Sequence, residues 1–181
     1  AAPQHRRPAP RRDLQRLAGR QRVGCAYFRA RLEEEVHRAS SQEGVLSLML
    51  LRFDGLEAMA GFYGEQSVRD FLADAADFLR EAVRRLDIVC RYGPTGFAIL
   101  LPSTGPSVTV VRQRLSQRLE QWMTSRPTPG GKVQALVGHS VFPDDVQTSR
   151  DLLAGAHPKP IGTDAHEEQS SSAPWKERWA A

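Results

Sequence analysis

Two spacings of apolar residues recur along the middle of this chain, and they predict alternating helices and strands. Apolar residues four apart among charged ones predict a helix over Tyr27–Ala39 with one buried stripe. The run VLSLMLLRF (Val45–Phe53) is almost continuously apolar, which is typical of a strand covered on both faces. Asp54-Gly55 ends this run, and a short helix is expected to follow through Met59.

The rest of the pattern predicts three more helices and three more strands. They are a helix from about Glu65 to Leu86, strands Ile88–Tyr92 and Phe97–Leu101 around a tight turn, a helix from about Ser107 to Trp122, strand Val133–Phe142, and a helix Ser149–Ala156 that ends at His157-Pro158. This order favours an α+β sandwich, with helices on the faces of a central mixed sheet that contains an antiparallel hairpin.

Both ends of the chain differ in composition from this middle part. Residues 1–22 contain seven arginines, one acid (Asp13) and three prolines, so residues 1–25 are predicted to be a flexible basic leader or linker. A contact with an acidic partner or a nucleic acid is the alternative use of this segment. Residues 158–181 are polar and serine-rich and are predicted to be a disordered tail. The folded domain is therefore expected over residues 26–157.

Charge and cysteine content narrow the class of protein. The formal net charge is +4, but the basic leader supplies more than all of it, so the folded part has no basic face and no nucleic-acid partner is expected. No stretch reaches the roughly 18 apolar residues of a membrane span, so no membrane insertion is expected. Cys25 and Cys90 lie far apart in the sequence, which is typical of reduced thiols in a cytoplasmic protein.

Three stretches together are similar to one bacterial domain family. They are LSLMLLRFDGLEAMAGFYGEQSVRDFL, LREAVRRLDIVCRYGPTGFAILLPST and VQALVGHSVFPDDVQTSRDLLAGA. They resemble the GGDEF domain, the diguanylate cyclase module that joins two GTP molecules into cyclic di-GMP. The resemblance covers about residues 26–156 and implies a palm-like α+β fold, with helices on the faces of the sheet.

The signature turn of that family is degenerate here. The resemblance aligns Gly-Gly-Asp/Glu-Glu-Phe with Gly93, Pro94, Thr95, Gly96 and Phe97, so both acidic positions are lost. Proline also replaces a glycine whose N–H could face a phosphate, and proline has no N–H to donate. The turn is thus expected to remain as a hairpin without its chemistry.

Other family positions are changed as well. The metal-binding Asp at the end of the first strand corresponds to Arg52, while a second Asp is kept as Asp54. The Asn and Asp that help to hold guanine correspond to Ala60 and Arg69, and the basic residue beyond the last helix falls in the altered sequence PKPIGT. Mg²⁺ needs hard carboxylate ligands, and a unit charge pair about 4 Å apart is worth roughly 4 kcal/mol at an effective dielectric near 20. No catalytic residue, metal site or cofactor is therefore predicted, and Arg52 is expected to be a surface or ion-paired side chain, or alternatively to contact a nucleotide phosphate.

One family motif survives next to the hairpin. Arg84 and Asp87 match, in type and spacing, the R-x-x-D of the inhibitory site at which the family binds its product cyclic di-GMP. A guanidinium can bind guanine O6 and N7, and a carboxylate can accept from guanine N1–H and N2–H. The alternative is a helix end with cations that suit its dipole, Asp87 capping or pairing there. A further arginine would complete such a site, and the sequence does not choose among Arg112, Arg114 and Arg118.

Two functions follow from this pattern. The first is a catalytically inactive GGDEF domain that acts as a cyclic di-GMP receptor and regulatory module. It would pass the signal to an adjoining domain or a partner protein, and it could form a homodimer. The alternative is a pseudo-GGDEF module for protein interaction or dimerisation that binds no nucleotide. His139 and the pair Asp144-Asp145 are weaker candidates for ligands, and they are expected to be structural.

Overall fold

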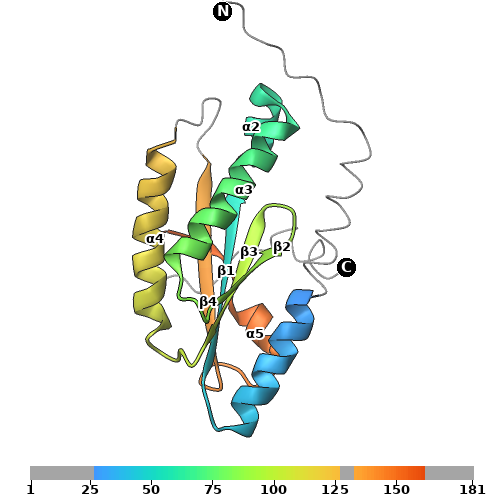
Figure 1. Cartoon of the computed structure of the whole chain (residues 1–181), viewed down its shortest axis with the longest axis vertical. Coiled ribbons are helices and arrows are strands. Elements are labelled where there is room, and N and C mark those ends of the chain that lie inside the picture. Colours follow the sequence, from blue (N-terminus) through green and yellow to red (C-terminus); the bar gives the residue numbers. More distant parts are fainter. Residues whose placement is uncertain (1–26, 127–132, 162–181) are drawn as a thin grey trace, which may run out of the picture.

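A computed structural model describes residues 27–126 and 133–161 of the 181-residue chain (Figure 1). A helix over residues 27–41 comes first. The following elements are β1 (Leu46–Asp54), α2 (Leu56–Tyr63), α3 (Glu65–Ala82), β2 (Ile88–Tyr92), β3 (Gly96–Pro102), α4 (Val108–Thr124), β4 (Gln134–Phe142), α5 (Ser149–Gly155) and β5 (Lys159–Pro160). The predicted order of helices and strands is confirmed. Helix α3 ends four residues earlier than predicted because Val83 is extended (φ −104°, ψ 171°).

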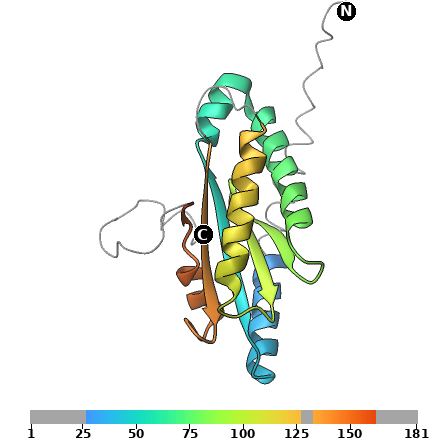
Figure 2. The ribbon, with the colours of Figure 1, turned by 90° about the vertical axis from the view of Figure 1, so that its left-hand side faces the viewer.

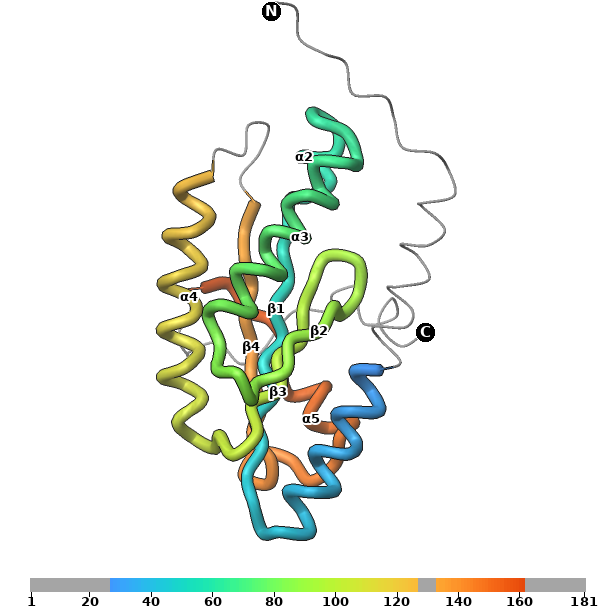
Figure 3. The backbone as a smooth tube through the Cα atoms, viewed as in Figure 1, coloured from blue at the N-terminus to red at the C-terminus, as the bar shows by residue number. Residues whose placement is uncertain are grey.

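The strands form one sheet in the order β2-β3-β1-β4-β5, and each pairing is antiparallel. The α+β fold is confirmed, but the described sheet is not mixed. The reason lies in the connections, which Figure 3 traces. The segment β1-α2-α3-β2 returns to the sheet beyond β3, and β3-α4-β4 returns beyond β1. Each helical crossover therefore skips one strand, and the parallel strands it joins are not neighbours.

Helices cover both faces of the sheet, as Figure 2 shows from the side. Alternate residues of a strand point to opposite faces. Met49, Leu51 and Phe53 of β1 pack with α3 and α4, whereas Leu48 and Leu50 pack with the N-terminal helix and α5. Strand β1 is thus buried from both sides, which explains its continuous apolar sequence.

The last helix is short, and the chain then turns back onto the sheet. Thr148 caps the start of α5 by accepting a hydrogen bond from the Asp151 N–H. After Gly155 the chain crosses β4 so closely that a Cβ on Gly138 would lie 1.8 Å from the His157 carbonyl oxygen. Lys159–Pro160 then pairs with β4. The described chain continues through residue 161, and residues 162–181 of the predicted tail lie outside the described residues.

The predicted basic leader (residues 1–25) also lies outside the described residues. None of the helices that the structure describes has the length and apolar composition to cross a bilayer.

Candidate functional site

The hairpin turn leaves no space for a side chain at its fourth position. Gly96 begins β3 and lies opposite Arg52 of β1 in the ladder. A Cβ built on Gly96 would lie 2.6 Å from the Leu51 carbonyl oxygen and 2.9 Å from that of Tyr92. The turn is also held against β1, because the Phe53 N–H donates to the Thr95 carbonyl oxygen at 3.0 Å. The position of Gly96, which the resemblance aligns with an acid, is therefore closed to a side chain by backbone.

Arg52 and Asp54 form an ion pair beside this turn. The Arg52 Nε lies 2.9 Å from the Asp54 Oδ1, and Nη2 donates to Oδ2 at 3.0 Å. The Arg52 side chain is 19% exposed, and Asp54 is about half exposed. The negative charge of Asp54 is thus neutralised by Arg52, which stands where the resemblance aligns a metal-binding Asp. Among the described residues, no group of three or more His, Cys, Asp or Glu side chains is arranged to hold a metal ion.

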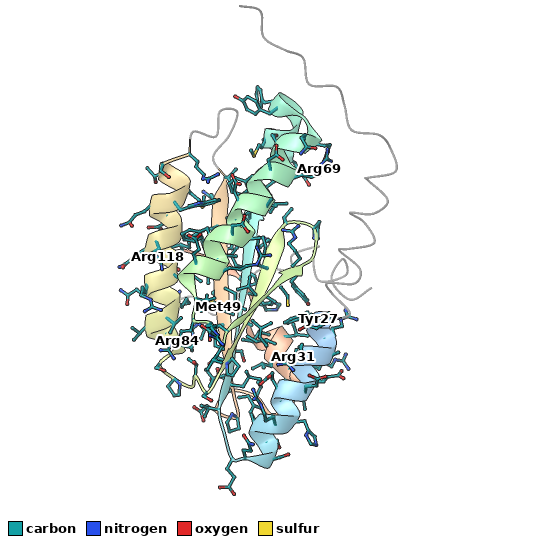
Figure 4. The ribbon with its side chains drawn as sticks, viewed as in Figure 1. Tyr27, Arg31, Met49, Arg69, Arg84 and Arg118 are labelled. Carbon is teal, nitrogen blue, oxygen red and sulfur yellow. The ribbon has the colours of Figure 1, made fainter. Side chains whose placement is uncertain are left out.

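The two positions aligned with guanine-binding residues also lack their chemistry. Ala60 lies in α2 and has a methyl side chain. Arg69 lies near the start of α3, where it donates from Nε and Nη2 to the Gln66 Oε1 at 3.1 and 3.0 Å (Figure 4). Neither position offers an amide or a carboxylate to a base.

Arg84 and Asp87 form the turn between α3 and β2. The Arg84 N–H donates to the Asp87 Oδ2 at 2.7 Å, and the Asp87 N–H donates to the Arg84 carbonyl oxygen at 3.0 Å. The turn thus fixes the carboxylate, while the Arg84 and Arg85 side chains are exposed. Burial raises the pKa of Asp87, against the opposing effects of the Arg84 hydrogen bond and the charges of Arg84 and Arg114. The pair lies at the surface and not in a core salt bridge.

The three arginines left open by the sequence lie in different surroundings. Arg114 is near enough to Asp87 for its positive charge to oppose the rise in the pKa of that carboxyl. The charge of Arg112 acts instead on His139. Arg118 lies over the ring of Phe78, 5.8 Å from its centroid, on the side of α4 that faces α3 (Figure 4). The structure therefore associates only Arg114 of these three with the Arg84–Asp87 turn.

A groove of about 460 Å³ joins this turn to the N-terminal helix. The helix lines it with Arg31, Glu35 and Arg38, and Arg84 and Asp87 line it from the α3–β2 turn. Glu35 is 3% exposed and binds both helix arginines, with Arg31 Nη2 donating at 2.8 Å. We call this the Arg84 groove. Sequence reasoning missed the helix residues, although their spacing of four and three residues would have placed them on one helical face.

His139 and Asp145 have structural surroundings. His139 is half-buried in β4, and its pKa is lowered by burial and by the Arg112 charge, against the opposing charge of Asp145. Asp145 accepts the Val141 N–H at 2.8 Å and so closes the turn after β4.

Comparison with known proteins places these features in context. The sequence model of the family described as "Diguanylate cyclase, GGDEF domain" matches residues 24–159. The chain is 26% identical, over 128 residues, to the bifunctional diguanylate cyclase/cyclic di-GMP phosphodiesterase MucR of Pseudomonas aeruginosa. The match covers 70% of this chain and 18% of MucR, so the chain spans less than a fifth of that relative's length.

Solved structures share the fold. The GGDEF domain of PA1120 (YfiN or TpbB) from Pseudomonas aeruginosa superposes with a TM-score of 0.62 at 22% identity, over 72% of this chain and 83% of that one. The GGDEF domain of DgcB from Caulobacter crescentus, in complex with c-di-GMP, gives 0.60 at 17% identity over 70% and 76%. Diguanylate cyclase SiaD of Pseudomonas aeruginosa, in complex with its activator SiaC, gives 0.63 at 22% identity over 72% and 50%.

Proposed function

Because this chain belongs to the diguanylate cyclase GGDEF domain family, we propose that it is a member without cyclase activity that binds cyclic di-GMP in the Arg84 groove. The observation on which this depends is the contrast between two places in the fold. Beside the hairpin, backbone closes the side-chain position of Gly96 and Arg52 is paired with the carboxylate of Asp54, whereas Arg84 lines an open groove next to a fixed carboxylate.

The loss of cyclase activity rests on the chemistry of metal binding. Phosphoryl transfer needs Mg²⁺ to neutralise charge on the phosphates, and the ion takes oxygen ligands from carboxylates. Beside the hairpin the retained carboxylate of Asp54 is already paired with Arg52. A metal ion would have to displace that guanidinium and would then lie next to its positive charge. Gly96 cannot contribute a side-chain ligand, since it has no side chain and no space for one.

The proposed receptor site rests on the groups that meet at the α3–β2 turn. The Arg84 guanidinium can donate to guanine O6 and N7 or to a phosphate. Asp87 already accepts the Arg84 N–H at Oδ2, and no described residue donates to its Oδ1, which can accept from a guanine edge. Arg114 adds a positive charge nearby. A dinucleotide with two guanines and two phosphates matches this combination of cations and one acceptor.

Calorimetric titration with cyclic di-GMP tests the proposal. The full chain is expected to bind, and Arg84→Ala is expected to abolish the heat. Arg80→Ala is the control and should leave the heat unchanged, because Arg80 is an exposed arginine of α3 that does not line the groove. Absence of heat from the folded wild type at tens of micromolar ligand would overturn the receptor assignment. Turnover of GTP with Mg²⁺ would overturn the assignment as an inactive member.

A second candidate is a protein-interaction or dimerisation module, and one observation favours it. Leu86 lies within the same turn and is 80% exposed, and Val110, one helical turn before Arg114 on α4, is 68% exposed. Apolar side chains this exposed near a groove are a feature of contact surfaces. Under this alternative Arg84→Ala has no effect on function, and Leu86→Asp prevents association with a partner or a second copy. Size-exclusion chromatography with light scattering of the Leu86→Asp variant separates the two candidates.

We further propose that the binding signal passes to an adjoining domain or a partner protein of a cytoplasmic signalling system. The folded unit over residues 26–157 remains the predicted domain for this role. The position of the Arg84 groove against the N-terminal helix supports the proposal, because a ligand there would contact both the sheet edge and the helix that enters the domain.

A further inference from the structure

A second hollow lies on the sheet face that the N-terminal helix and α5 cover. It has a volume of about 530 Å³, within the usual range of small-molecule sites. Its walls are the N-terminal helix and α5, and its floor is formed by Leu50 and Leu51 of β1. We call it the α5 hollow. It shares no lining residue with the Arg84 groove.

The early end of α5 produces this hollow. Helix α5 stops at Gly155, and the chain then lies flat on Gly138 of β4, where the absence of a Cβ permits the contact. His157 and Pro158 are therefore not helical, and both line the hollow. The hollow lies between these residues, Leu50 of β1 and Leu32 of the N-terminal helix.

The two walls present the same pair of side chains. The N-terminal helix contributes Arg29 and Leu32, and α5 contributes Arg150 and Leu153, each pair spaced i, i+3 so that both members lie on one helical face. Leu32 is buried and Leu153 is half-buried, which makes the interior apolar. Arg29 and Arg150 are exposed at the rim, and neither forms an ion pair with another side chain in the described ranges. Each wall thus has a cation above an apolar interior.

The charged residues at the rim favour a ligand with a negative charge. Arg29, Arg52 and Arg150 line the hollow, and Glu33 is the one acid among the lining residues that the structure describes. Arg52 is paired with Asp54, so Arg29 and Arg150 are the two cations offered to a ligand. Tyr92 also lines the hollow, and its ring lies edge-on against Phe28 at 5.4 Å between centroids.

We propose that the α5 hollow binds a small organic anion with an apolar body, such as an aryl sulfonate or a medium-chain carboxylate. The apolar part lies on Leu32, Leu50 and Leu153, and the anionic group lies between Arg29 and Arg150. Such a ligand loses apolar surface to the hollow and keeps its charge at the solvent-exposed rim, where two guanidinium groups donate to it.

A fluorescence titration of the full chain with 8-anilinonaphthalene-1-sulfonate tests the proposal. The expected result is saturable binding of one probe per chain, displaced by decanoate and not by decanol, because decanol has no charge. The double variant Arg29→Glu/Arg150→Glu is expected to weaken binding by about tenfold or more. Ala154→Trp, which fills the hollow from an exposed lining position, is expected to abolish it.

Arg69→Glu is the control, because Arg69 is a half-buried arginine on α3 that does not line the hollow. It is expected to leave probe binding unchanged, with all variants melting cooperatively. Non-saturable binding, equal loss in Arg69→Glu, or unchanged binding in Ala154→Trp would each overturn the proposal. Full displacement of the probe by cyclic di-GMP would also overturn it, since the hollow would then be a nucleotide site. Failure of cyclic di-GMP to bind anywhere would leave this result unaffected.

Discussion

The closed backbone around Gly96 leads to a prediction about the substitution Gly96→Ala. A new Cβ would meet two carbonyl oxygens, that of Leu51 at 2.6 Å and that of Tyr92 at 2.9 Å. Both are backbone atoms in a paired sheet, so they cannot rotate away as the end of a long side chain can. Gly96 does not have a positive φ, so the cost arises from space and not from backbone conformation.

The size of the effect follows from two opposing contributions. Forcing one extra carbon into a packed site costs about 1–3 kcal/mol. Replacing glycine by alanine returns roughly 0.4–1 kcal/mol, because the unfolded chain loses freedom. The free energy of unfolding is therefore expected to fall by about 1–2 kcal/mol. Gly96→Glu has the same Cβ, so restoring the acid alone is expected to weaken the hairpin rather than rebuild a metal site.

Urea denaturation followed by circular dichroism measures this change. With a slope of about 1–3 kcal/mol per molar, the midpoint for Gly96→Ala should shift down by roughly 0.3–2 M. Gly61→Ala provides the control of opposite sign. Gly61 lies within α2, and a Cβ there meets nothing within 4 Å. Alanine is the better helix former, so this variant should gain about 0.5–1 kcal/mol.

A Gly96→Ala variant as stable as the wild type would refute the reasoning. It would mean that β3 stands further from β1 at this point, with space for a side chain. The assignment of the fourth turn position as closed would then fail. The Gly61→Ala control excludes a general effect of alanine, because the free energy of unfolding is expected to rise in Gly61→Ala and to fall in Gly96→Ala.

Three further predictions concern charged side chains. Burial raises the pKa of Asp87, so cyclic di-GMP affinity should fall on acidification at a higher pH than for an ordinary aspartate, and Asp87→Asn should flatten the calorimetric pH profile. The free energy of unfolding should change with pH in the opposite direction. The folded chain favours the protonated form of Asp87, so the stabilisation from this group is present at low pH and is lost as pH rises through the folded pKa. Burial and the Arg112 charge lower the pKa of His139, so its neutral form stabilises the fold above about pH 6.5, and this contribution is lost as pH falls through the folded pKa. His139→Gln should therefore reduce acid sensitivity in thermal melts. Glu35→Ala should lower the free energy of unfolding by about 1–2 kcal/mol, because it removes a buried carboxylate with two arginine partners. Glu34→Ala, at an exposed carboxylate, should lower it by less than roughly 0.5 kcal/mol. Urea denaturation measures both changes, and equal changes would contradict the prediction.

The fold could be predicted largely from local patterns. The apolar run of β1 indicated a strand buried on both faces, and the turn residues indicated the β2–β3 hairpin. Whether neighbouring strands run parallel or antiparallel was harder to predict, because the apolar pattern of a strand does not show which strand lies beside it. Strand β5 was missed for a different reason: Lys159–Pro160 is short, polar and proline-containing, and it follows residues that lie against Gly138 of β4, a contact between distant parts of the chain.

The candidate site was predicted in part. The motif spacing identified Arg84 and Asp87, but no sequence pattern shows that the Arg84 N–H, not its side chain, holds the carboxylate. Arg52 could be located from the alignment of motifs, while its pairing with Asp54 depends on side-chain geometry two residues apart on one strand face. The contributions of Arg31 and Arg38 depend on how the N-terminal helix packs, which a local pattern does not specify.

The short strand β5 also has a consequence for the behaviour of the protein at high concentration. An uncovered strand edge offers a row of N–H and C=O groups to other chains, and such edges promote aggregation. Lys159–Pro160 pairs with Leu136 and Val137 of β4, and Pro160 has no N–H to offer a further strand. Growth of the sheet by addition of a foreign strand is therefore blocked at this part of its border, and substitutions of Pro160 that restore a donor are the ones to examine if preparations precipitate.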